Sequence, residues 1–231
     1  MNLTTQALVQ LSRIAEAERV CRESMSAMTK IGACDDLFLH MGLYQELAKV
    51  LIRREKNVEA HAIMQRCFDQ SVRIRGPDHA ATLDIGVELG RCLHILHKTA
   101  DAAVLYRDIL DKFKRASPPD FSSEAGCACL LAQSLSHIHK HGEALALFQE
   151  YVPKIKRVLG PDHIMHLQVV PGYVQALARV FRIKEAEVLL VEAVEAQKRA
   201  LGNKNALTIE SLKLLATIRE CPAYDILCGN S

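Results

Sequence analysis

Tryptophan is absent from the sequence, and aromatic residues make up only 5% of its 231 residues. Glycine (11) and proline (7) are also scarce, so the chain has few of the residues that break helices. Alanine and leucine dominate an apolar fraction of 49%, whereas strands favour β-branched and aromatic side chains. The composition therefore predicts an all-α protein with enough apolar surface for a continuous core.

Neither sign of charge prevails, because 29 Lys and Arg residues oppose 27 Asp and Glu residues, for a formal charge of +2. Nucleic-acid and membrane-surface binding both need a concentrated basic surface, so we expect neither partner. No apolar run approaches the ~20 residues of a membrane span. The segment that starts Met1-Asn2-Leu3-Thr4 also lacks the charged and then apolar order of a secretory signal. We therefore expect a soluble, cytoplasmic protein.

The cysteines are irregularly spaced and contain no CxxC pair; they are Cys21, Cys34, Cys67, Cys92, Cys127, Cys129, Cys221 and Cys228. In a chain of this length such cysteines indicate buried, reduced thiols. Cys127 and Cys129 cannot share a metal, because residues two apart on a helix point about 200° apart. A structural zinc site needs four convergent ligands, and nearby only His137 and His141 are spaced to share a face. We expect no metal and no cofactor.

A repeat with a period of forty-two residues is the strongest pattern in the sequence. Gly76-Pro77-Asp78-His79 recurs two periods later as Gly160-Pro161-Asp162-His163, and Pro118-Pro119-Asp120 stands halfway between them. Four columns keep the same period: an alanine that follows an acid, an arginine, a leucine followed by a small residue, and a bulky residue. They comprise Ala60, Ala102, Ala144 and Ala186; Arg73, Arg115, Arg157 and Arg199; Leu47-Ala48, Leu89-Gly90 and Leu131-Ala132; and Met64, Tyr106, Phe148 and Leu190. Such a period predicts a solenoid of stacked helix pairs.

Each repeat divides into a first helix, A, and a second helix, B. The acid before the alanine suits the first turn of B, the arginine suits its last turn, and a glycine ends it. We predict A helices near 37–53, 80–97, 122–139, 164–181 and 206–220, and B helices near 15–30, 57–74, 100–115, 142–158 and 184–200. Residues 3–13 would form a shortened first A helix and residues 221–231 a tail. Residues 1–231 would thus form a single solenoid of about five hairpins.

The linkers between repeats carry their own predictions. Asp78, Asp120 and Asp162 precede A helices and are predicted to be N-caps or first-turn acids. His79 and His163 recur with the repeat, so we expect them to serve as packing or hydrogen-bonding groups and not as catalysts. Pro171-Gly172 interrupts one A helix and predicts a kink there, or a helix that restarts at Pro171.

The columns resemble the tetratricopeptide repeat, in which a Leu-Gly/Ala pair in helix A faces an Ala in helix B, followed four residues later by a bulky residue. Leu89-Gly90, Ala102 and Tyr106 match that pattern. The longer period and the segment from Gly76 to Leu83 resemble the G-x-x-H-x-x-T-L repeats of kinesin light chains and nephrocystin-like proteins. The segment from Gly160 to Leu167 departs from them only where His166 replaces Thr. The resemblance implies a right-handed α-solenoid, a tetratricopeptide-like superhelix that holds other proteins.

In tetratricopeptide arrays the A helices line a concave groove, so the resemblance also implies groove-facing residues. These are Lys49, Arg53, Arg91, His94, Gln133, His137, Gln175 and Arg179. This face would be basic to polar, with Asp84 and Glu210 as its main acids, and would suit an extended peptide with acidic or amide side chains. A solvated face without a ligand is the alternative.

No catalytic motif stands out, since the sequence lacks HExxH, a P-loop, GxGxxG and a Ser-His-Asp order. We therefore expect a non-catalytic interaction scaffold or adaptor, not an enzyme. One alternative is a regulatory segment of a larger signalling protein or enzyme, and another is a spacer or homo-oligomer built through the solenoid ends. The basic clusters Lys112–Arg115 and Lys154–Arg157 are either solvated helix ends or contacts for phosphoinositides or acidic surfaces.

Overall fold

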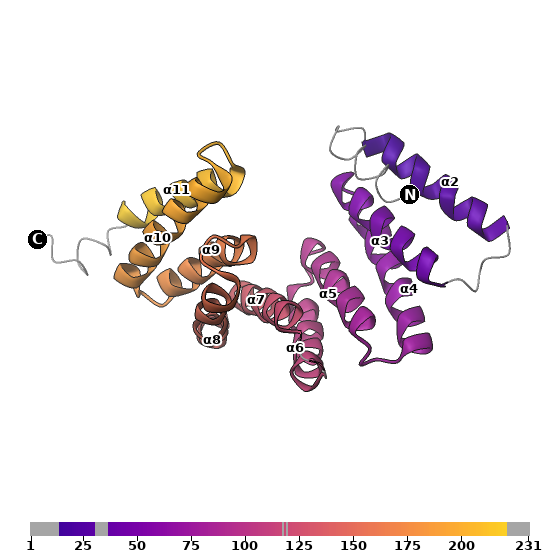
Figure 1. Ribbon diagram of the computed structural model, residues 1–231, viewed down its shortest axis with the longest axis horizontal. Helices are drawn as coiled ribbons and strands as arrows, with labels where there is room; N and C mark the ends of the chain where they lie inside the picture. Colours follow the sequence, from indigo (N-terminus) through magenta and orange to yellow (C-terminus); the bar gives the residue numbers. More distant parts are fainter. Residues whose placement is uncertain (1–13, 31–36, 117, 119, 221–231) are drawn as a thin grey trace, which may run out of the picture. The chain divides into compact units, whose positions relative to one another are not determined.

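The computed structural model describes residues 14–30, 37–116, 118 and 120–220. Over these residues the chain forms ten α-helices and no strand, which confirms the predicted all-α class (Figure 1). The helices belong to two compact units, residues 1–120 and 121–231. The predicted helix at 3–13, the predicted tail at 221–231 and Cys34, Cys221 and Cys228 lie outside the described residues. That residues 1–231 form one solenoid stays a prediction.

Within each unit the helices follow one another as hairpins, and each helix packs against the next one in the chain. The first unit contains α2 (Ile14–Lys30), α3 (Leu37–Arg53), α4 (Asn57–Arg75), α5 (Ala80–Ile95) and α6 (Thr99–Arg115). The second contains α7 (Phe121–His137), α8 (His141–Leu159), α9 (Ile164–Arg179), α10 (Ile183–Leu201) and α11 (Ala206–Arg219). In the second unit α9 also contacts α7 and α11, so three A helices adjoin one another.

The alanine column marks the contact between the two helices of each hairpin. Ala60, Ala102, Ala144 and Ala186 are all fully buried, and every residue of the bulky column is at most 1% exposed. The fit is closest at Gly90 of α5, where a Cβ atom would lie only 2.6 Å from Cζ of Tyr106 in α6. Small residues in one column therefore make room for large ones in the other.

The linkers between hairpins depend on a backbone shape that only glycine adopts readily. Gly76, Gly160 and Gly202 each follow a B helix with φ between 87° and 100° and ψ between 158° and 162°. Residues with a Cβ atom essentially never occupy this region. No described atom lies within 4 Å of where a Cβ would stand at these glycines, so the constraint comes from the backbone and not from packing.

The N-caps after these glycines differ from the prediction. His79 Nδ1 accepts a hydrogen bond from Ala81 N and His163 Nδ1 accepts one from Met165 N, each at 3.2 Å, and Asn205 Oδ1 does the same for Leu207 N at 3.0 Å. Asp78 and Asp162 precede the caps, so their assignment as N-caps or first-turn acids is wrong. The predicted hydrogen-bonding role of the two histidines is confirmed. Asp162 instead accepts a hydrogen bond from Arg199 Nη2 at 3.1 Å.

The turns inside the hairpins explain where the A helices end. Glu55, His97, His139 and Phe181 are spaced by exactly one repeat period and have φ between 60° and 63°. The residue after each donates its N–H to the carbonyl five residues back, for example Lys98 N to Leu93 O at 2.9 Å. This is the hydrogen bond of a Schellman motif, which stops a helix. The predicted A-helix ends at 97, 139 and 181 were therefore two residues too late.

Pro171 does not interrupt its helix, because α9 runs unbroken from Ile164 to Arg179. The prediction that a helix restarts at Pro171 is wrong. A residue with an N–H at this position would bond to the carbonyl of Leu167, four residues earlier. That carbonyl instead accepts a hydrogen bond from Nε2 of the fully buried Gln197 in α10, at 3.0 Å. A side chain from the neighbouring helix thus supplies the donor that proline lacks.

We predict that Gln197→Met destabilises the protein by about 1–3 kcal/mol, because it leaves the Leu167 carbonyl without a donor. Combined with Pro171→Ala, the same change should cost clearly less, because the new alanine supplies its own N–H. Urea unfolding of the wild type, both single variants and the double variant measures this coupling. Additive effects of the two substitutions would contradict the compensation.

For the linkers, we predict that Gly160→Ala lowers the free energy of unfolding by about 1–3 kcal/mol, because alanine disfavours the required φ and ψ. Gly142→Ala is the matched control, since Gly142 lies exposed in the first turn of α8 with no described atom near its virtual Cβ. That change should be neutral or stabilise by up to about 1 kcal/mol. Equal urea midpoints for the two variants would disprove the linker's dependence on glycine.

Candidate functional site

The structure places the predicted groove residues of the second unit on two adjoining A helices. Gln133 and His137 belong to α7, and Gln175 and Arg179 belong to α9. We call these four residues the A-helix face. Three of them are exposed, and Gln133 is half-buried.

Gln133 owes its position to Gly172 of α9. A Cβ atom at Gly172 would lie 3.4 Å from Nε2 of Gln133 and 3.3 Å from the ring of Phe148. The glycine therefore lets the two A helices hold the Gln133 side chain between them. Arg179 makes no ion pair with any residue that the structure describes, so its guanidinium is available to a ligand.

The other four predicted groove residues belong to the first unit. Two of them, Lys49 and Arg91, lie beside acids that partly neutralise their charge. Lys49 Nζ lies 3.1 Å from Glu46 Oε1, and Arg91 Nε lies 3.9 Å from Glu88 Oε2. Both acids stand three residues before the cation with which they pair, so this face carries two more acids than the predicted Asp84 and Glu210. Arg53 is exposed and His94 half-buried. Whether all eight residues form one groove stays a prediction.

The basic clusters on the B helices are also accompanied by acids. Lys112 Nζ lies 2.7 Å from Asp108, Lys154 Nζ 2.9 Å from Glu150, and Lys156 Nζ 2.9 Å from Glu192. Such exposed pairs contribute little to stability, but they offset the positive charge that binding to an anionic surface would need.

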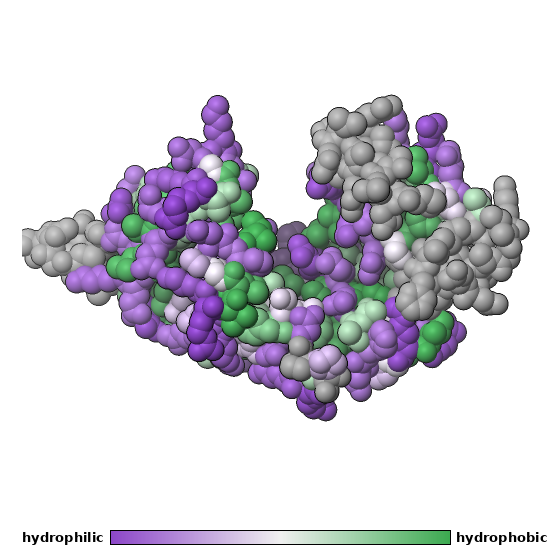
Figure 2. Space-filling model, viewed as in Figure 1, coloured by the Kyte–Doolittle hydropathy of each residue, from purple (hydrophilic) through white to green (hydrophobic). Residues whose placement is uncertain are grey.

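Figure 2 shows hydrophilic residues predominating around α10 and α11, with hydrophobic residues in small areas among them.

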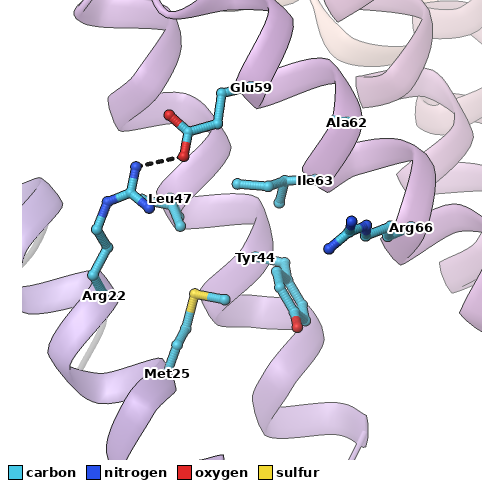
Figure 3. Close-up of a pocket in the computed structure, with 8 residues that line it drawn as sticks. All are labelled: Arg22, Met25, Tyr44, Leu47, Glu59, Ala62, Ile63 and Arg66. Atoms are coloured by element: carbon cyan, nitrogen blue, oxygen red, sulfur yellow. Dashed lines mark hydrogen bonds and ion pairs between the residues drawn. The ribbon is translucent and has the colours of Figure 1, made fainter.

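A pocket that was not predicted from the sequence lies between α2, α3 and α4 (Figure 3). It measures about 430 Å³ and is lined by Arg22, Met25, Tyr44, Leu47, Glu59, Ala62, Ile63 and Arg66. In Figure 3 the ion pair between Arg22 and Glu59, 2.5 Å long, stands on one side and the Arg66 side chain on the other. Met25, Tyr44 and Ile63 lie between them. Its volume is within the range of small-molecule sites, and an apolar group with an acidic end would suit it.

Two residues gave a signal for this pocket. Tyr44 occupies the column that holds Gly86, Ala128, Val170 and Leu212 in later repeats, where it is the only aromatic residue. Arg66 likewise occupies a column that is acidic in later repeats, at Asp108, Glu150 and Glu192. Departures from the repeat, and not the repeat itself, mark this site.

Beside the pocket, a buried carboxylate ties α2 to the turn that joins α3 and α4. Glu18 is 5% exposed and accepts hydrogen bonds from Arg22 Nε (3.0 Å), Arg54 Nη1 (2.5 Å) and Lys56 Nζ (2.9 Å). Burial raises the pKa of Glu18, but the three hydrogen bonds outweigh it and hold the pKa at about 2 instead of 4.5. Arg22 bonds to Glu59 as well, so the same network fixes one wall of the pocket.

The described thiols and histidines show no reactive arrangement. Cys21, Cys67, Cys92, Cys127 and Cys129 are buried, and none of these described cysteines belongs to a disulfide. Burial raises the pKa of the Cys127 and Cys129 thiols to about 12, which suppresses the reactive thiolate. Among the described residues no three His, Cys, Asp or Glu side chains gather as a metal site. None of the described helices combines the length and apolarity needed to cross a membrane.

Residues 125–164, which run from α7 through α8 to the start of α9, match the family model described as a tetratricopeptide repeat. This segment therefore resembles a tetratricopeptide repeat. It contains the Leu131-Ala132, Ala144 and Phe148 positions of three of the columns. None of the curated proteins has a sequence that matches this chain.

Solved structures extend the likeness to most of the chain. Two crystal structures of a Podosopora anserina protein, described as a putative kinesin light chain with nearly identical TPR-like repeats, superpose with TM-scores of 0.68 and 0.67. Both are 18% identical and cover 78% of this chain and 85% or 86% of their own. BtubC (BKLC) from P. vanneervenii has a TM-score of 0.59 at 15% identity, over 72% of this chain and 68% of its own. These likenesses show a shared fold, the kinesin-light-chain-like tetratricopeptide fold that the repeated columns predicted.

We predict that Glu18→Gln destabilises the first unit at neutral pH by about 1–3 kcal/mol, because it weakens three charge-assisted hydrogen bonds. The pKa of Glu18 is lower in the folded state, so its stabilisation is fully present above about pH 4.5 and is lost as the pH falls towards 2. The difference between wild type and variant should therefore shrink over that range in urea unfolding monitored by circular dichroism.

Glu23→Gln is the control, since Glu23 is exposed and lies 3.8 Å from the equally exposed Arg19. It should change stability by less than about 0.5 kcal/mol at any pH. A Glu18→Gln effect that stays constant between pH 7 and 3 would refute the assigned hydrogen-bond network.

Proposed function

We propose that this chain is a non-catalytic scaffold or adaptor that holds a segment of another protein. The observation that carries the proposal is the tetratricopeptide fold, in which stacked hairpins present long rows of side chains to a partner. A fold alone does not determine function, so the proposal also depends on the chemistry of the A-helix face.

The A-helix face suits an extended peptide. Gln133 and Gln175 offer both a donor and an acceptor to a peptide backbone, and Arg179 offers a planar fork of donors to a carboxylate. Lys49 and Arg91 already form ion pairs with Glu46 and Glu88. The proposed preference for an acidic partner therefore depends on Arg53 and Arg179. We also place the protein in the cytoplasm, which the buried thiols without disulfides support. Association through solenoid ends stays a prediction.

Panning a phage library of random peptides against the full chain tests the proposal. Enriched peptides should bind Arg179→Glu at least tenfold more weakly than wild type, because the variant opposes a carboxylate where a cation stood. Gln175→Ala should weaken binding of the same peptides by a smaller factor.

Lys184→Glu is the matched control, because it makes the same charge reversal at an exposed residue that belongs to α10 and is not one of the four residues of the A-helix face. It should leave affinity within twofold of wild type. Peptides that bind Arg179→Glu as tightly as wild type would exclude the A-helix face. Failure to enrich any peptide would count against a peptide-binding scaffold.

A further inference from the structure

The pocket between α2, α3 and α4 adjoins a place where the first hairpin departs from the repeat, at Tyr44. One period later, Gly86 of α5 leaves room for two side chains from the flanking B helices. A Cβ atom there would lie 2.9 Å from Cε2 of Phe68 and 2.7 Å from Cδ1 of Ile109. Tyr44 puts an aromatic ring at this position, and Cys67, one period before Ile109, is correspondingly smaller. The space over α3 is therefore filled differently, and the pocket of about 430 Å³ lies beside it.

Side chains from all three helices make most of the lining apolar. Leu47 of α3 is 1% exposed, and Met25, Tyr44 and Ile63 pack partly buried against the same core cluster. Figure 3 shows Met25 of α2, Tyr44 of α3 and Ile63 of α4 around one shared space. The volume lies within the ~300–1,000 Å³ of small-molecule sites, so a short apolar chain or ring can enter.

Arg66 is the charge in this pocket that no described residue neutralises. In later repeats its column holds acids, which pair with lysines of the B helices. Asp69, three residues after Arg66, instead accepts a hydrogen bond from Gln65 at 2.9 Å. No ion pair joins Arg66 to any residue in the described part of the chain. In Figure 3 its guanidinium points from α4 toward Tyr44 and Ile63, into the space that the apolar side chains surround.

The other two charged residues of the lining already oppose each other. Arg22 Nη2 lies 2.5 Å from Glu59 Oε1 and 2.9 Å from the buried Glu18. One positive charge, that of Arg66, thus remains for a ligand. A carboxylate carries one negative charge, and its two oxygen atoms match the fork of guanidinium donors. A phosphate monoester carries about −1.5 to −2 at neutral pH and would leave negative charge unmatched.

We propose that this pocket binds a monocarboxylic acid with an apolar body, such as a short fatty acid, whose carboxylate pairs with Arg66. The apolar body lies against Met25, Tyr44 and Ile63, where it excludes water from the ion pair and so strengthens it. The site belongs to the first unit, so it can be correct or wrong whatever the A-helix face of the second unit binds.

Titration of the full chain with octanoate tests the site, and 1-octanol is the comparison ligand with the same chain length and no charge. The six methionines, labelled with ¹³C in their methyl groups, report binding in an NMR spectrum. The Met25 signal, assigned by its loss in Met25→Leu, should shift saturably, and the signal of Met165 in the second unit should not. Octanol should bind about tenfold more weakly, because it lacks the charge-assisted hydrogen bonds of a carboxylate.

Substitutions in α4 separate the charge of the pocket from its shape. Arg66→Gln removes the surplus charge at an exposed residue, and it should weaken octanoate binding about tenfold while octanol binding stays within twofold. Arg73→Gln is the matched control, because it makes the same change at an exposed arginine of the same helix that does not line the pocket. Ala62→Trp fills the pocket and should abolish binding of both compounds; its column already holds the larger, exposed Val104 and Val188.

Three results would each overturn the proposal. They are the absence of a saturable Met25 shift, equal affinity for octanoate and octanol, and wild-type octanoate affinity in Arg66→Gln. None of them bears on peptide binding by the A-helix face, which the phage panning tests separately.

Discussion

The close approach of the two helices in each hairpin is the constraint on which the other features depend. Ala60, Ala102, Ala144 and Ala186 are fully buried at that contact, and any larger side chain there would push the helices apart. With the helices this close, the bulky column fills the space beside the alanine, and at Gly90 even a methyl group would collide with Tyr106. The period of the sequence is the repetition of this one contact along the chain.

Two kinds of turn reverse the chain: the linkers between hairpins and the turns inside them. Only the linkers could be recognised from the sequence. Gly76, Gly160 and Gly202 could be recognised because glycine is nearly the only residue that adopts their backbone angles. The turns inside the hairpins have positive φ at Glu55, His97, His139 and Phe181, and no single residue type occupies all four positions. Their strain is tolerated because the hydrogen bonds of the Schellman motif fix the turn, so composition alone could not place these helix ends.

The same distinction separates the fold from the candidate sites. Columns that recur with the repeat predicted the helices to within two residues, because each repeat solves the same packing problem. The net charge of the predicted groove residues in the first unit was less predictable. Glu46 and Glu88 stand one period apart and each lies three residues before a cation, but only Asp84 and Glu210 had been counted as acids of that face. The restart at Pro171 was wrongly predicted for a related reason: the donor that compensates for the proline, Gln197, comes from a different helix, α10.

Departures from the repeat are therefore the positions where function can be sought. A residue type shared by all repeats is needed for the packing of the hairpins. A residue that differs from its column is not required for that packing, or it has a different role. Tyr44 and Arg66 differ in the first unit, and both line the pocket beside α2. His166 differs in the second unit from the threonines of two other repeats, and its Nε2 is buried without a hydrogen-bond partner among the described residues. An unsatisfied buried nitrogen lowers stability by about 1–3 kcal/mol, a cost that Thr82 and Thr208 avoid at the same position because each has a hydrogen-bond partner.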